Sequence, residues 1–183
     1  GSFEELLDKV DAASVVVPTK SHYKITKELL NNGIHALVEK PMTGTVSEAE
    51  DLITLSKKTS TILQPGYIER FNPALDAIKK LDVSLKFIEC HRLSPFTFRS
   101  ADIGVVLDLM IHDIDIILYL SKSKVKKIDA VGVNVIADKE DIANARIQFE
   151  NGCVANITAS RVSFEPMRRI RLFSENSYIS LDY

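Results

Sequence analysis

Residues 33–41 read Gly-Ile-His-Ala-Leu-Val-Glu-Lys-Pro, and this stretch decides the fold. Asn32-Gly33 is a left-handed end signal for a preceding helix. The apolar run that follows, residues 35–38, is typical of a buried strand. A similar run lies upstream at residues 13–17 and ends at a proline. Its run of valines predicts a strand that is buried on both faces.

Helical segments connect this run to its neighbours. One helix is predicted over residues 20–31. A second is predicted to be capped by Ser47, with Glu50 three residues on completing a capping box, and to run to about Lys58. A third strand, residues 61–64, is followed by Pro-Gly. Strand–helix–strand–helix–strand with short links predicts a parallel sheet with right-handed crossovers. Ligands of such sheets bind beyond the carboxyl ends of the strands.

The pattern changes after Gly66. Asn72-Pro73 predicts the N-cap and first position of a helix that runs to about Leu81. A strand at 85–93 and a polar, aromatic loop follow, and Asn151-Gly152 predicts a tight hairpin further on. The remaining elements are an apolar helix at 105–120 and strands at 128–137, 142–149, 153–161, 168–173 and 178–183. Alternating polarity in these strands predicts an antiparallel sheet that helices cover on one face.

A doubly wound nucleotide-binding domain normally begins with a glycine-rich turn, but the sequence contains no G-x-G-x-x-G. We therefore expect the C-terminal half of a Rossmann-like parallel sheet, residues 1–66, followed by an α+β domain, residues 67–183. The second domain would be a helix-covered, mostly antiparallel open sheet. Because the chain starts midway through the pattern and stops within a predicted strand, we expect both ends to be truncated relative to the natural protein.

The composition excludes several classes of function. The chain has 183 residues, 45% of them hydrophobic and 26% charged, with a net charge of −2. No basic field exists to bind nucleic acid or a membrane surface. The apolar helix carries four polar residues, and each carboxylate at mid-membrane would cost about 2.5–3.5 kcal/mol, so no membrane span is expected. Cys90 and Cys153 show neither metal-ligand spacing nor a disulfide framework, which predicts no metal and a cytoplasmic protein.

Lys40 follows a predicted parallel strand, between Glu39 and Pro41. At that position it would face the ligand crevice, where a lysine can exchange a proton or hydrogen-bond a substrate hydroxyl. The alternative is an ordinary solvated charge after a strand.

Asp108 and His112 are four residues apart, which places them on one face of the apolar helix. A buried carboxylate and imidazole are costly unless they are paired or used, and a histidine beside a carboxylate can act as a general base. The alternative is a structural pair, or a carboxylate favoured by the helix dipole. We assign Asp113 and Asp115, on other faces, to solvent or to structure.

Arginines gather in two predicted loop regions. Arg70 and Asn72 follow the third strand, and Arg92 and Arg99 border the loop after the strand at 85–93. Guanidinium groups bind phosphate or carboxylate in a forked geometry, so these four residues are candidates for an anionic substrate such as a nucleotide sugar. The alternative is a set of ordinary ion pairs.

Three motifs together resemble the glucose–fructose oxidoreductase/inositol dehydrogenase/rhizopine-catabolism (Gfo/Idh/MocA) family of NAD(P)-dependent sugar dehydrogenases. They are Val-Val-Val-Pro-Thr-x-x-His at 15–22, Glu-Lys-Pro at 39–41 and Asp-x-x-x-His at 108–112. Their order and spacing agree with the family along essentially the whole chain. The glycine-rich approach to the third motif is reduced here to Gly104.

The resemblance implies a role for each motif. Lys40 would contact the substrate hydroxyl and assist proton transfer. His112 would be the acid/base residue, and Asp108 would position either the substrate or the imidazole. The Lys40 and His112 side chains, from different domains, would converge on one substrate carbon. The same motifs imply that six residues bind or border the cofactor: Pro18, Thr19, His22, Glu39, Lys40 and Pro41. In this family the Lys-Pro peptide is commonly cis.

Within the family, the segments at 67–73, 92–96 and 107–115 look most like the branch that oxidises the 3-hydroxyl of UDP-N-acetylglucosamine for lipid A biosynthesis. This implies NAD or NADP as cofactor, a sugar or nucleotide sugar as substrate, and a homo-oligomer, dimer or tetramer. The alternatives are a non-catalytic sugar- or nucleotide-binding regulator on the same scaffold, or an inert fragment of the enzyme.

Overall fold

The structure is a computed structural model that describes residues 2–79, 83–97 and 103–182. The chain forms two compact units, residues 1–67 and residues 68–183. Among the described residues, no helix is both long enough and apolar enough to cross a bilayer.

Unit 1 is a three-stranded parallel sheet, as predicted, and its strand order is β1-β2-β3. After a short 3-10 turn, η1 (Phe3–Leu6), its elements are β1 (Ala12–Val15), α1 (Thr19–Asn31), β2 (His35–Glu39), α2 (Val46–Thr59) and β3 (Leu63–Gly66). Gly33 adopts φ +75°, which confirms the left-handed end predicted for α1.

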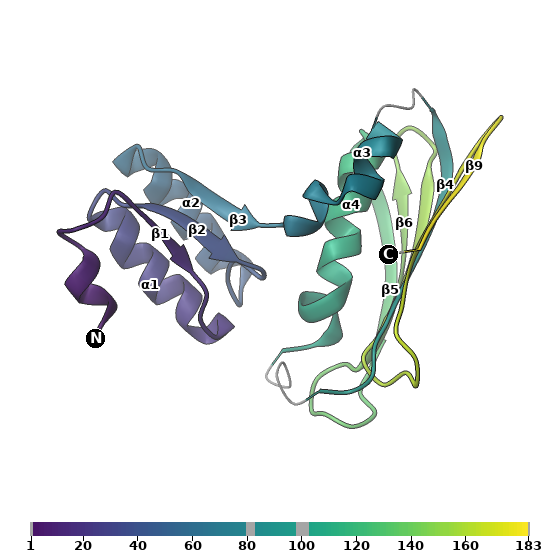
Figure 1. The fold of residues 1–183 in the computed structure, drawn as a ribbon. Helices are drawn as coiled ribbons and strands as arrows, with labels where there is room; N and C mark the ends of the chain where they lie inside the picture. Colours follow the sequence, from purple (N-terminus) through teal and green to yellow (C-terminus); the bar gives the residue numbers. More distant parts are fainter. Residues whose placement is uncertain (1, 80–82, 98–102, 183) are drawn as a thin grey trace. The chain divides into compact units, whose positions relative to one another are not determined.

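Both helices of unit 1 pack on one face of its sheet. Leu30 of α1, Leu52 of α2 and Val38 of β2 belong to one buried cluster (Figure 1). On the opposite face, Leu37 is 42% exposed, so burial alternates along β1 and β2. The prediction of a strand buried on both faces is therefore wrong for the described chain. This face has a shallow hollow of about 340 Å³, lined mainly by Ala12, Ser14, His35, Leu37, Ile62 and Gln64.

Two local predictions in unit 1 need correction. Helix α2 is capped by Thr45, whose hydroxyl accepts the Glu48 N–H at 3.3 Å while the Glu48 carboxylate accepts the Thr45 N–H at 3.2 Å. The capping box therefore lies two residues before Ser47. Strand β3 includes Pro65, although we predicted from the sequence that the strand ends before this proline. An edge strand tolerates proline because one side needs no backbone donor.

Unit 2 is a six-stranded sheet with the order β5-β6-β7-β4-β8-β9, in which only β4 and β7 pair in parallel. Its helical elements are η2 (Ile68–Phe71), α3 (Pro73–Lys79), the π-helical turn η4 (Val106–Met110) and α4 (Ile111–Ser121). Its strands are β4 (Leu85–Leu93), β5 (Val125–Val133), β6 (Ile142–Phe149), β7 (Val154–Ser160), β8 (Met167–Ser174) and β9 (Tyr178–Asp182). The open, mostly antiparallel sheet confirms the predicted fold class.

Helices α3 and α4 cover one face of this sheet (Figure 1). Ile78 of α3 and Ile117 of α4 share a buried cluster with Ala145, Ile157 and other strand residues. These strand residues alternate with partly exposed ones such as Thr158, so the other face is open. The period-two pattern of the sequence therefore identified the covered face correctly.

Strand β5 ends at Val133, not at residue 137 as predicted. The reason is a side chain. The N–H groups of Val135, Ile136 and Ala137 donate to one carboxylate oxygen of Asp141 at 2.8, 2.6 and 3.0 Å, so they leave the strand ladder.

Candidate active site

Two loops at the carboxyl ends of β1 and β2 are joined by His22. This side chain is 1% exposed, and its ring nitrogens lie 2.8 Å from the carbonyl oxygen of Val17 and 2.8 Å from that of Pro41. Both partners are acceptors, so a neutral imidazole donates to one of them at a time. His22 therefore lies beneath both predicted cofactor loops and fixes their spacing.

The Glu39–Pro41 segment follows β2 directly. The Lys40-Pro41 peptide is cis, as the resemblance implied. Glu39 and Lys40 are both partly exposed, whereas Pro41 is buried. In the same unit Pro18 is exposed and Thr19 partly exposed. A partly exposed carboxylate at the carboxyl end of a strand can accept hydrogen bonds from the hydroxyl groups of a bound ribose.

Gly66 is a residue of this edge that sequence reasoning missed. It pairs with Glu39 across the sheet, and a Cβ on it would lie 3.2 Å from the Val38 carbonyl oxygen and 3.3 Å from the Glu39 Cα. The Pro-Gly pair was read only as a strand terminator. Its glycine also lets β3 approach the end of β2 closely.

Asp108 and His112 lie on the helix of unit 2, on either side of the junction between η4 and α4. Both side chains are partly exposed. Met110, which lies between them in the sequence, and Asp113, which follows His112, are buried. Asp108 lies inside the π-helical turn, a local widening that is frequent at functional sites. The periodicity of apolar residues does not distinguish such a turn from a regular helix, so the sequence predicted only the helix.

Arg92 is 3% exposed and belongs to a buried ion-pair network. Its guanidinium donates to Asp113 at 2.9 and 3.1 Å and to Glu69 at 3.2 Å. Burial raises the pKa of the Asp113 carboxyl, and the hydrogen bonds from Arg92 oppose this rise. Of the two assignments given for Asp113, the structural one is therefore correct and the solvent one is wrong.

Arg70 forms a forked ion pair with Asp115 at 2.5 and 2.6 Å, and its guanidinium lies over the Tyr119 ring at 5.4 Å. The Arg70 side chain remains 43% exposed. Asn72 caps α3, since its side-chain oxygen accepts the Ala74 N–H at 3.0 Å, as predicted. Arg99 lies outside the described residues. Three of the four candidate substrate residues thus have internal partners.

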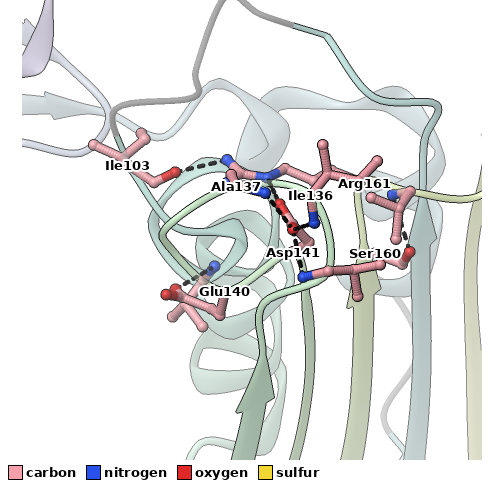
Figure 2. Close-up of polar contacts among 10 residues, drawn as sticks. Ile103, Ile136, Ala137, Glu140, Asp141, Ser160 and Arg161 are labelled. Carbon is pink, nitrogen blue, oxygen red and sulfur yellow. Dashed lines mark hydrogen bonds and ion pairs between the residues drawn. The ribbon is translucent and has the colours of Figure 1, made fainter.

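A second buried ion pair, which sequence reasoning missed, lies where β7 ends and β6 begins (Figure 2). Asp141 is 0% exposed, and Arg161 donates to it at 2.8 Å and to the Ile103 carbonyl at 2.6 Å. Burial alone would raise the pKa of Asp141. Three backbone N–H donors and Arg161 outweigh that effect and hold the pKa well below its usual range. The sequence offers one signal for this pair, a charged residue, Asp141, directly before an apolar strand.

The described part of the chain has no cluster of three His, Cys, Asp or Glu side chains that could hold a metal ion. The lysine, the histidine and the carboxylates described above can supply hydrogen bonds and transfer protons.

Comparison with known proteins places both units. Residues 1–67 match the family model described as an oxidoreductase family with an NAD-binding Rossmann fold. Residues 86–180 match the model of the GFO/IDH/MocA C-terminal domain.

Individual relatives agree with these matches. UDP-N-acetylglucosamine 3-dehydrogenase of Acidithiobacillus ferrooxidans is 40% identical over 183 residues, which is all of this chain and 58% of that protein. A solved structure of that enzyme superposes with a TM-score of 0.92 over 99% of this chain and 60% of its own length. The NAD-dependent scyllo-inositol 2-dehydrogenase of Bacillus subtilis is 29% identical over 84% of this chain and 49% of its own. The chain thus spans roughly half of its relatives' length, and it belongs to the Gfo/Idh/MocA oxidoreductase family.

Proposed function

We propose that the protein that contains this chain is an NAD(P)-dependent dehydrogenase that oxidises the 3-hydroxyl of UDP-N-acetylglucosamine to a ketone. The observation that supports this most directly is the 40% identity to the A. ferrooxidans enzyme, which extends over every residue of the chain. The other relative described above acts on an inositol, so the alcohol class is supported more broadly than the particular sugar.

The chain's own residues suit this chemistry. Lys40, partly exposed after β2, hydrogen-bonds the substrate hydroxyl, and His112, partly exposed on its helix, accepts the hydroxyl proton. Asp108, one helical turn before His112, orients the imidazole or the sugar. Pro18, Thr19 and Glu39 border the ribose of the cofactor, above the loops that His22 joins. The nicotinamide, when bound, supplies the acceptor for the hydride.

The substrate phosphates need a cation, and the exposure of the two described arginines favours one of them. Arg70 keeps 43% of its side chain exposed, and Arg92 keeps 4%. We therefore propose Arg70 as the diphosphate contact and assign Arg92 to the support of α4. Arg99 remains a candidate from the sequence alone.

The test is turnover of the full-length natural protein with UDP-N-acetylglucosamine and either NAD⁺ or NADP⁺, followed by the absorbance of the reduced cofactor. Lys40→Ala should lower kcat by about 10²–10⁴-fold, the usual contribution of a proton-transferring group. Lys57→Ala, which removes an exposed lysine from α2, is the matched control and should leave kcat unchanged.

Near-normal turnover by Lys40→Ala would remove Lys40 from the mechanism. Turnover of scyllo-inositol but not of the nucleotide sugar would retain the dehydrogenase and overturn the substrate. Binding of the sugar without any cofactor reduction would instead favour a non-catalytic sugar-binding regulator.

A further inference from the structure

The helix that carries Asp108 and His112 begins against Glu140, a residue of the β5–β6 loop. The backbone N–H of Val105 donates to the Glu140 carbonyl at 2.9 Å, and the N–H of Val106 faces the Glu140 carboxylate oxygen Oε1 at 3.4 Å. The first N–H groups of a helix have no partner within the helix. Glu140 therefore caps this helix with its backbone and its side chain, and its negative charge suits the positive end of the helix dipole.

Two glycines leave the space that the Glu140 side chain fills. A Cβ added to Gly104, directly before the helix, would lie 1.8 Å from Oε1 of Glu140 and 2.1 Å from its Cδ. A Cβ added to Gly132 on β5 would lie 3.2 Å from the Glu140 Cβ. The Glu140 side chain thus packs against two backbone positions that lack side chains, with its carboxylate at Gly104 and its Cβ and Cγ at Gly132. Any substituent at Gly104 must displace the carboxylate.

The buried ion pair holds both partners of this contact in place (Figure 2). Asp141, the next residue after Glu140, donates its N–H to the Val133 carbonyl at 2.8 Å and accepts the Arg161 N–H at 2.9 Å. The Arg161 side chain bonds both the Asp141 carboxylate and the carbonyl of Ile103, the residue before Gly104. One arginine therefore links the loop that carries Glu140 to the start of the helix.

The contact reaches Asp108 within one turn of the helix. The Asp108 N–H donates to the Gly104 carbonyl at 3.0 Å, so a shift of Gly104 is passed to Asp108 directly. His112 lies one further turn along the same helix.

We propose that Glu140 is a positioning residue, which fixes the start of the helix and thereby the place of Asp108 and His112 for proton transfer. This inference rests on the proposed dehydrogenase function for its kinetic test only. A misplacement of about 1 Å can cost about a hundredfold in rate, so the cap matters to chemistry beyond its contribution to stability.

The kinetic test compares four variants of the full-length natural protein. Glu140→Ala should lower kcat about tenfold or more while KM values change less than about threefold, the pattern of a lost transition-state interaction. Glu140→Gln keeps an acceptor oxygen for Val106 and should restore most of kcat. Gly104→Ala should resemble Glu140→Ala, because its Cβ displaces the carboxylate. The double variant Gly104→Ala/Glu140→Ala should be no slower than Glu140→Ala alone, since the two changes remove one contact.

The control is Thr45→Ala, which removes the N-cap of α2 in unit 1. It should lower the melting temperature comparably to Glu140→Ala and leave kcat unchanged. A readout independent of turnover is the NMR signal of the His112 ring, assigned by its loss in His112→Asn. It should shift in Glu140→Ala and stay in place in Thr45→Ala.

These measurements separate the two proposals. An unchanged kcat and an unchanged His112 signal in Glu140→Ala would overturn the positioning role, as would equal and additive losses in the two single variants. A wild type that reduces no cofactor would overturn the proposed function, and the His112 signal alone would then decide the role of Glu140.

Discussion

At the scale of single residues, Asp141 shows how one side chain shapes a loop. Its carboxylate accepts three backbone N–H groups and an arginine while it is fully buried. A buried carboxylate is tolerated when its hydrogen bonds and charge are satisfied in this way. The same carboxylate ends β5 and anchors the loop that carries Glu140.

This arrangement predicts how stability depends on pH. The pKa of Asp141 in the folded protein lies below its unfolded value of about 3.9, so the unfolded state takes up a proton first as the pH falls. The stabilisation is complete above about pH 5, declines below about pH 4 and continues to fall toward the folded-state pKa. Asp141→Asn should lose about 3–5 kcal/mol of unfolding free energy at neutral pH, because Arg161 is left without its buried partner.

Urea unfolding at neutral pH and near pH 3 measures this. The difference in unfolding free energy between wild type and Asp141→Asn should shrink at the lower pH. Asp138→Asn, an exposed carboxylate in the same loop, should show a small difference at either pH. A deficit in Asp141→Asn that did not change with pH would contradict the assignment.

At the scale of elements, apolar periodicity identified most helices and strands, and side-chain hydrogen bonds decided where they end. Strands β4 and β6 match their predicted ranges, because burial alternates along all of β6 and along β4 from Ile88 onward. Strand β5 was misplaced, because the Asp141 contact joins residues that only the folded loop brings together. The start of α2 was misplaced because Thr45-x-x-Glu48 and Ser47-x-x-Glu50 are both capping-box patterns.

The two possible caps of α2 can be compared directly. Thr45→Ala should lower the unfolding free energy by about 1 kcal/mol, because it leaves a helix N–H without its acceptor. Ser47→Ala should change it by less than about 0.5 kcal/mol, since Ser47 is an exposed residue inside the helix. Chemical denaturation of both variants measures the difference, and a larger loss in Ser47→Ala would restore the cap that the sequence first indicated.

The candidate site was predictable to different degrees at its different positions. Lys40, Asp108 and His112 stand at recognisable spacings, so the sequence alone could single them out. The partners of Arg70 and Arg92 could not be read in the same way, because Asp115 and Asp113 come from another element and meet them only in the folded unit. The positive charge of the arginines suggested that they bind an anion. In the folded unit, Arg70, Asn72 and Arg92 each contact another residue of the chain.

At the scale of the whole molecule, one face of the six-stranded sheet in unit 2 is left open by the described helices. Neighbouring strands pair across it, with Asn144 donating to Thr158 at 2.9 Å and Arg171 donating to Glu89 at 2.9 Å. Val131, on the same face, is 61% exposed. A face that carries both charges and apolar side chains can be complementary to its own copy. We propose that a second copy of the chain covers it.

Analytical ultracentrifugation of the full-length natural protein tests this proposal and should show a dimer or tetramer. Thr158→Arg adds a bulky charge at the middle of the open face and should favour the monomer. Asn176→Arg adds the same charge in the exposed β8–β9 turn and should not change the sedimentation. A monomeric wild type, or a Thr158→Arg variant with unchanged assembly, would contradict the proposal.

The place of β4 in its sheet has a consequence for biosynthesis. Its residue Cys90 pairs with Ile157 on one side and Ile170 on the other, so both neighbours of this strand are translated long after it. Local hairpins such as β6–β7 can close early, but the strand between β7 and β8 must wait for distant segments, which makes its pairing slow. A nascent chain that has emerged only as far as β5 would therefore expose β4 unpaired, and this is the stage at which we expect chaperones to engage it.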